Sequence, residues 1–231
     1  HRKIESEALS MLAWAKGELD FSVLDALPRD YESWLQEQAS QGKYLTDARQ
    51  VVLQRNVKAA EKCIERMRNG IRKLKNDRTC QKAFTWMNEA MLIQQIRSKL
   101  PTVFLQNEDD QWTYGTEVKV NPLDATTWPE QLKHFGRWRL FQLAFILMCL
   151  DDVSSDDSED YLDLIWFPTG GGKTEAYLGL SAFLLLHDRM SVGDEKGVRI
   201  LMRYTLRLLT SQQFERASAL ILSLDDIRKN H

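Results

Sequence analysis

The chain has 231 residues, 43% of them hydrophobic and 28% charged, which is the composition of a globular protein with a sizeable core. The formal net charge of −2 gives no overall signal for nucleic-acid binding, and the longest apolar run, residues 140–150, is too short for a bilayer span of about 20 residues. The three cysteines include no C-x-x-C pair, so they favour neither a disulfide framework nor a zinc site and fit a reducing, cytoplasmic compartment.

Residues 1–100 are predicted to form a mainly helical accessory region. We expect two short helices before residue 42, then one long helix over residues 46–76. Apolar residues recur in the long helix at alternating spacings of four and three, a heptad pattern that predicts a helical hairpin with a return helix carrying Phe84, Met87 and Met91. The apolar positions of the long helix are Leu53, Val57, Ala60, Ile64, Met67, Ile71 and Leu74.

The outer face of this predicted hairpin is basic. Residues 44–98 carry 12 Lys or Arg against 5 Asp or Glu. Three interpretations fit this pattern: a solvated helix surface, a ridge that contacts nucleic-acid phosphates, and a docking platform for a partner protein. The basic residues of the outer face are Arg55, Lys58, Lys62, Arg66, Arg72, Lys73, Lys75, Arg78 and Lys82.

Residues 101–135 read as an irregular linker that wraps the domain after it. The segment holds three prolines and several aromatic residues, so it is too aromatic to be disordered. Residues 116–120 alternate weakly, as an edge strand does.

Residues 136–231 are predicted to begin an α/β domain with a parallel sheet. A helix is expected over residues 137–150 and a strand over 162–167, followed by a glycine-rich loop and a helix over 174–187. A second strand is expected over 198–204, with helices over 206–216 and 217–228. This β-α-β-α order is typical of a parallel sheet with crossover helices.

The glycine-rich loop indicates a phosphate-binding site. It reads P-T-G-G-G-K-T over residues 168–174, and glycines let backbone N–H groups converge on phosphate oxygens. Lys173 supplies a charge for the β- and γ-phosphates of ATP, and Thr174 supplies a hydroxyl for Mg²⁺, so these two residues are the candidate catalytic residues. Phe167 stands where the strict phosphate-loop pattern has its first glycine, and a plain glycine-rich turn before a helix is the alternative.

This arrangement resembles superfamily 2 helicases and translocases, and a RecA-like motor domain is the fold that the resemblance implies. It also implies that an Arg-x-x-Gln element, Arg139 and Gln142, lies at the adenine, since an amide both donates and accepts. The end of the second strand is similar to the element that contacts the DNA backbone in that superfamily, which points to Arg203, Thr205 and Arg207. The full set of candidate nucleotide-binding residues is Arg139, Gln142, Thr169, Gly170, Gly171, Gly172, Lys173, Thr174 and Glu175.

Residues 50–225, and most specifically residues 161–216, also resemble the DrmA family of large helicases from DISARM anti-phage systems. The resemblance implies a bacterial, cytoplasmic, ATP-dependent DNA helicase or translocase subunit that acts on DNA. It also implies other subunits of a defence complex as partners and no association with a membrane. The chain begins without methionine and ends soon after the phosphate loop, so we expect a fragment that binds nucleotide but hydrolyses it negligibly alone. Another P-loop ATPase, such as an AAA+ remodeller or a nucleotide kinase, is an alternative, as is the non-enzymatic docking platform.

Overall fold

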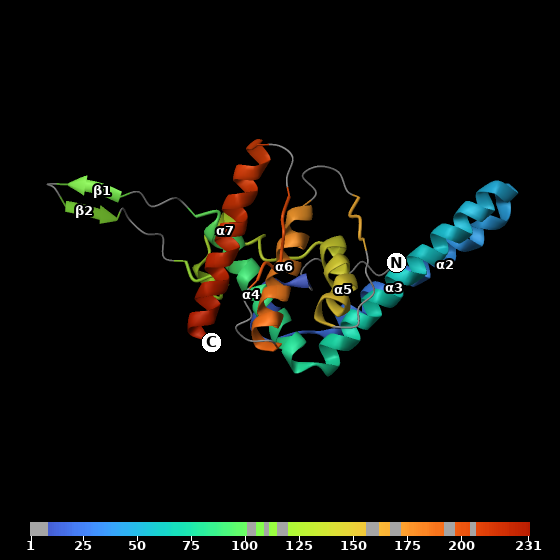
Figure 1. The fold of residues 1–231 in the computed structure, drawn as a ribbon, viewed down its shortest axis with the longest axis horizontal. Coiled ribbons are helices and arrows are strands. Elements are labelled where there is room, and N and C mark those ends of the chain that lie inside the picture. Colours follow the sequence, from blue (N-terminus) through green and yellow to red (C-terminus); the bar gives the residue numbers. More distant parts are fainter. Residues whose placement is uncertain are drawn as a thin grey trace.

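The computed structural model describes residues 9–100, 105–108, 111–114, 120–155, 162–166, 172–191, 197–203 and 207–231. In this part of the chain, helices predominate (Figure 1). The helices are α1 (Met11–Ala15), α2 (Phe21–Ser40), α3 (Asp47–Asn76), α4 (Arg78–Arg97), α5 (Leu140–Ser154), α6 (Lys173–Ser191) and α7 (Arg207–Asn230), with 3-10 turns η2 (Gln41–Tyr44), η3 (Ala125–Thr127) and η4 (Glu130–Leu132). Strands β1 (Leu105–Glu108) and β2 (Gln111–Tyr114) pair antiparallel.

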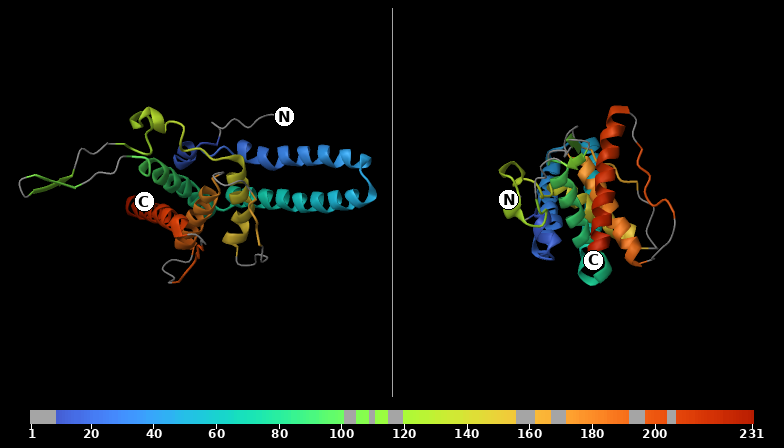
Figure 2. Two further views of the ribbon diagram at one scale, coloured as in Figure 1. Left: turned by 90° about the horizontal axis from the view of Figure 1, so that it is seen from above. Right: turned by 90° about the vertical axis from the view of Figure 1, so that its left-hand side faces the viewer.

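A long helical arm projects from one side of the molecule. It consists of α2 and the N-terminal half of α3, which run side by side in opposite directions (Figure 2). The heptad positions of α3 form its packed face, because those from Ile64 to Leu74 are buried and the three before them are half-buried. A helical hairpin is present, but α2 and α3 form it, and the expected return helix α4 does not run back along the arm (Figure 2).

Helix α4 is the centre of the helical core. It packs against α1, α6 and α7, and it buries residues on all its faces, including Phe84, Met87 and Met91. The polar side chain of Asn88 is also buried there, and its Oδ1 accepts a 2.7 Å hydrogen bond from the indole Nε1 of Trp138. Since a buried amide needs a partner, this bond fixes the segment before α5 on the core.

Helix α5 crosses α3 closely at Gly70. A Cβ added to Gly70 would overlap the carbonyl oxygen of Leu147, so only glycine permits this approach. Beside the crossing, the buried guanidinium of Arg66 bonds the carboxylates of Asp152 at 2.6 Å and Asp163 at 2.6 and 2.7 Å. Arg66 is therefore a structural ion-pair centre, not part of the exposed basic face where its spacing placed it.

The structure describes parts of the predicted linker. Within residues 101–135, β1 and β2 form a two-stranded hairpin on the opposite side from the arm (Figure 1). Trp128 and Leu132 are buried in the core, so residues 120–135 cover the helices as expected of a wrapping segment. Most of the expected edge strand, residues 116–119, lies outside the described residues.

The predicted α/β class with a RecA-like parallel sheet is wrong for this structure. Residues 162–166 and 198–203, the described parts of the two expected strands, pair with no strand in the described chain. Several of their apolar side chains are exposed, with Leu162 at 99% and Val198 at 85%, whereas parallel strands are buried and apolar on both faces. Helix packing supplies the core instead. None of the described helices is both long and apolar enough to cross a membrane.

Candidate functional site

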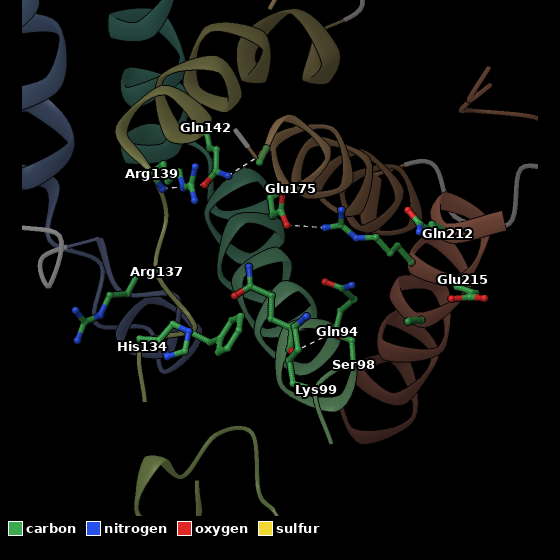
Figure 3. Close-up of a pocket in the computed structure, with 15 residues that line it drawn as sticks. Gln94, Ser98, Lys99, His134, Arg137, Arg139, Gln142, Glu175, Gln212 and Glu215 are labelled. Atoms are coloured by element: carbon green, nitrogen blue, oxygen red, sulfur yellow. Dashed lines mark hydrogen bonds and ion pairs between the residues drawn. The ribbon is translucent and has the colours of Figure 1, made fainter. Parts of the chain in front are cut away.

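A pocket of about 810 Å³ lies where the first turns of α5 and α6 face α4 and α7 (Figure 3). Its size is within the usual range of small-molecule sites, roughly 300–1,000 Å³. The lining residues are Gln94, Gln95, Ser98, Lys99, His134, Phe135, Arg137, Arg139, Gln142, Gly172, Glu175, Gln212, Glu215, Arg216 and Ala219. Four of the predicted nucleotide residues, Arg139, Gln142, Gly172 and Glu175, are therefore brought together here.

Gln142 joins the start of α5 to the glycine loop. Its Oε1 accepts a 2.8 Å hydrogen bond from the backbone N–H of Arg139, and its Nε2 donates a 2.7 Å bond to the carbonyl of Gly172. Gly172 has a φ of +84°, and a Cβ there would come within 2.7 Å of Nε2 of Gln142. Both the backbone conformation and the available space thus require glycine at this position.

The same geometry bears on the predicted adenine contact of Gln142. The side chain is 3% exposed, and both ends of its amide are engaged by the protein's own backbone. Contact with an adenine edge would require the amide to exchange these two bonds for bonds to the base. The adenine role stays a prediction.

Glu175 links the first turn of α6 to α7. Its Oε1 accepts a 2.6 Å hydrogen bond from the guanidinium of Arg216, and its Oε2 is buried without a hydrogen-bond partner among the described residues. Gln94 of α4, 2% exposed, likewise has an unpartnered Oε1 at this pocket. Such buried acceptors normally have a partner, so these two oxygens are exceptions within the described chain.

The pocket carries more positive than negative side chains. Lys99, Arg137, Arg139 and Arg216 line it, against the carboxylates of Glu175 and Glu215. Arg139 approaches the glycine loop closely, since a Cβ on Gly172 would lie 3.9 Å from its Cζ. The excess of cations favours a ligand with negative charge.

Lys173 and Thr174 are the first two residues of α6, directly after Gly172. The backbone N–H groups of a first helical turn have no intrahelical acceptor, and the helix dipole adds partial positive charge there, so this position suits an anion. Neither side chain lines the pocket, and both are half-buried. Thr169, Gly170 and Gly171 lie outside the described residues.

The predicted DNA-contacting residues are not part of this pocket. Arg203 is exposed on an extended segment. Thr205 lies outside the described residues, and Arg207 is described only as the first backbone position of α7. Their role stays a prediction.

Several lining residues carried no signal in the sequence. Lys99, His134 and Arg137 come from the end of α4 and from the segment before α5, and no motif connects them to the glycine loop. Arg216 lies within the stretch that resembles the helicase family, but its pairing with Glu175 depends on how α7 packs across α6. Of the lining residues, Arg139, Gln142, Gly172 and Glu175 were predicted from the sequence.

Comparison with known proteins gives one clear relationship. No protein-family model matches the chain. DISARM protein DrmA of Bacillus paralicheniformis is 36% identical over 216 residues, which cover 89% of this chain and 17% of that protein. The resemblance inferred over residues 50–225 is confirmed. The chain is thus a relative of DISARM protein DrmA along most of its own length, and it spans 17% of the length of that relative.

Proposed function

We propose that this chain supplies the ATP-binding loop of an ATP-dependent DNA helicase or translocase that acts in DISARM-like defence against phage. The relationship to DISARM protein DrmA supports the defence role and the presence of other defence subunits as partners. The glycine loop and its helix support nucleotide binding. Because the chain spans 17% of that relative, the activity is proposed for the complete protein that contains it.

The observation that carries the proposal is the position of Gly172. It has a left-handed backbone, leads directly into the N-terminus of α6, and faces a pocket with an excess of cations. Phosphate-binding loops combine these three features, because the ligand is held by backbone N–H groups that a Cβ would obstruct.

The residues fit a triphosphate with its metal ion. Thr169 to Thr174 would surround the phosphates, Lys173 would neutralise their charge, and the hydroxyl of Thr174 would bind Mg²⁺. The ion supplies electrostatic stabilisation of the charge that develops on the phosphoryl group. Arg139 lies close enough to the loop to add a further positive charge.

The test uses the full-length protein with a matched pair of lysine variants. Lys173→Ala is expected to lower ATPase activity by at least about 100-fold, because an electrostatic contact made in the transition state is worth roughly that factor. Lys58→Ala removes an exposed lysine from the distant arm and should leave activity unchanged. Equal activity of the two variants and the wild type would rule out the motor.

DNA binding distinguishes a helicase from another class of P-loop ATPase. Arg203→Ala with Arg207→Ala should weaken DNA affinity and reduce its dependence on salt concentration, because each lost phosphate contact releases one fewer counterion. A protein that hydrolyses ATP but binds DNA equally well with and without these arginines belongs to another class of ATPase. Loss of phage protection in the Lys173→Ala strain connects the activity to defence.

A further inference from the structure

A second cluster of reactive side chains lies at the far end of α6, about 21 Å along the helix from Lys173 at 1.5 Å per residue. Asp77 ends α3 and caps α4, Cys80 lies in the first turn of α4, and His187 lies near the end of α6. One ligand atom from each of the three lies within 4.8 Å of the others. Cys80 and His187 are buried, and Asp77 is half-buried.

His187 provides an independent reason to expect a ligand. The residue is 8% exposed, yet its Nδ1 is buried and has no hydrogen-bond partner among the described residues. Its Nε2 has only a long contact of 3.4 Å with the hydroxyl of Ser191. An imidazole held in this way loses its water without replacement, which costs free energy unless another group binds it.

The carboxylate of Asp77 is already positioned by the backbone. Its Oδ1 accepts hydrogen bonds from the N–H groups of Thr79 at 2.8 Å and Cys80 at 3.1 Å. These bonds cap α4 and use one carboxylate oxygen, so Oδ2 remains as the donor atom for coordination. A carboxylate fixed by hydrogen bonds in this way is typical of metal ligands.

We propose that Asp77, Cys80 and His187 form a Zn²⁺ site that fastens the corner between α3 and α4 to the end of α6. Thiolate, imidazole and carboxylate are the ligand types that Zn²⁺ prefers, and a water molecule from the side of half-buried Asp77 would complete a tetrahedron. In such a tetrahedron the ligand atoms lie about 3.3–3.6 Å apart, so the side chains must close by roughly 1 Å on binding.

The charges around the cluster are compatible with a divalent cation. Asp77 and the thiolate of Cys80 would balance the two charges of Zn²⁺. Lys73 lies nearby, where its Nζ donates to the hydroxyl of Ser155 at 3.3 Å, and the carboxylate of Asp188 on α6 pairs with Arg199.

The experiment titrates the intact protein, stripped of metal by a chelator, with Zn²⁺ and with Co²⁺ as a spectroscopic substitute. We expect one ion per chain, the visible bands of tetrahedral Co²⁺ and a sulfur-to-cobalt charge-transfer band. Cys80→Ser, His187→Gln and Asp77→Asn should each weaken binding by roughly 100-fold or more, since losing an outer-sphere partner alone costs 10–100-fold. Cys63→Ser removes a thiol outside the cluster and should bind normally.

Asp77→Asn is the sharpest variant, because asparagine caps a helix as well as aspartate does and the fold is preserved. Unchanged affinity in Asp77→Asn or Cys80→Ser, or a Co²⁺ complex without the sulfur band, would overturn the proposal. A wild-type protein whose thermal midpoint does not rise with Zn²⁺ would overturn it too, and this measurement requires no variant. None of these readouts depends on ATP.

Discussion

Gln142 is expected to hold the glycine loop against α5 through two hydrogen bonds, and two substitutions separate the contributions of these bonds. Gln142→Met has a similar length and removes both hydrogen bonds, to the N–H of Arg139 and to the carbonyl of Gly172. At about 0.5–1.5 kcal/mol for each bond, the free energy of unfolding should fall by about 1–3 kcal/mol. For a chain of this size that is a fall of roughly 2–12 °C in thermal midpoint.

Gln142→Glu keeps the acceptor for Arg139 but has no donor for Gly172. Amide hydrogen exchange is the appropriate assay, because it measures the two ends separately. The Met variant should lose protection at the N–H of Arg139, which donates to Gln142, and at residues 176–179, whose N–H groups donate into the first turn of α6. The Glu variant should lose it only at 176–179. If both variants keep wild-type protection and thermal midpoint, the amide does not join these elements and the argument fails.

Three further predictions concern the helices that frame the site. Gly70→Ala should lower stability by about 1–3 kcal/mol in urea unfolding despite the better helix propensity of alanine, because its Cβ overlaps the α5 backbone. Hydrogen bonding to Arg66 lowers the pKa of Asp163, so the pair stabilises the fold fully above the ordinary aspartate pKa of about 4. This stability is lost as the pH falls through the lowered pKa. The thermal midpoint of Arg66→Met should therefore be lower at neutral pH and change less on acidification. Trp138→Phe leaves the Oδ1 of Asn88 buried without its partner and should cost about 1–3 kcal/mol, while equal urea midpoints would contradict the bond.

The long helices could be predicted because the spacing of apolar residues along a helix depends only on which of its own faces is buried. The heptad positions of α3 are all buried or half-buried, and α6 was expected over 174–187 and found over Lys173–Ser191. The partner of each face could not be predicted. Two short helices were expected before residue 42, but α2 alone spans Phe21–Ser40, with Asp20 as its N-cap and Pro28 inside it. Because the length of α2 was not predicted, α4 was expected beside α3 where α2 lies.

The strands could not be predicted from residue type, because an apolar run becomes a parallel strand only when another strand lies beside it. Leu164 and Trp166 are 82% and 87% exposed in extended chain, where the sequence suggested a buried strand. Asp152 shows the same limitation for charge. It lies beyond the helix expected over residues 137–150, yet it belongs to α5, where its bond to Arg66 holds the last turn against α3.

The candidate site depends on helix packing rather than on a sheet. The carbonyl of Gly172 is held from α5 by Gln142, and the first turn of α6 is held from α7 by the bond between Glu175 and Arg216. The glycine loop therefore keeps a defined end although no strand precedes it in the described chain. Since α6 also packs along α4, a substitution that separates α5 or α7 from α6 should disturb residues 172–175 before it disturbs the core. The hydrogen-exchange pattern of the Gln142 variants measures that order directly.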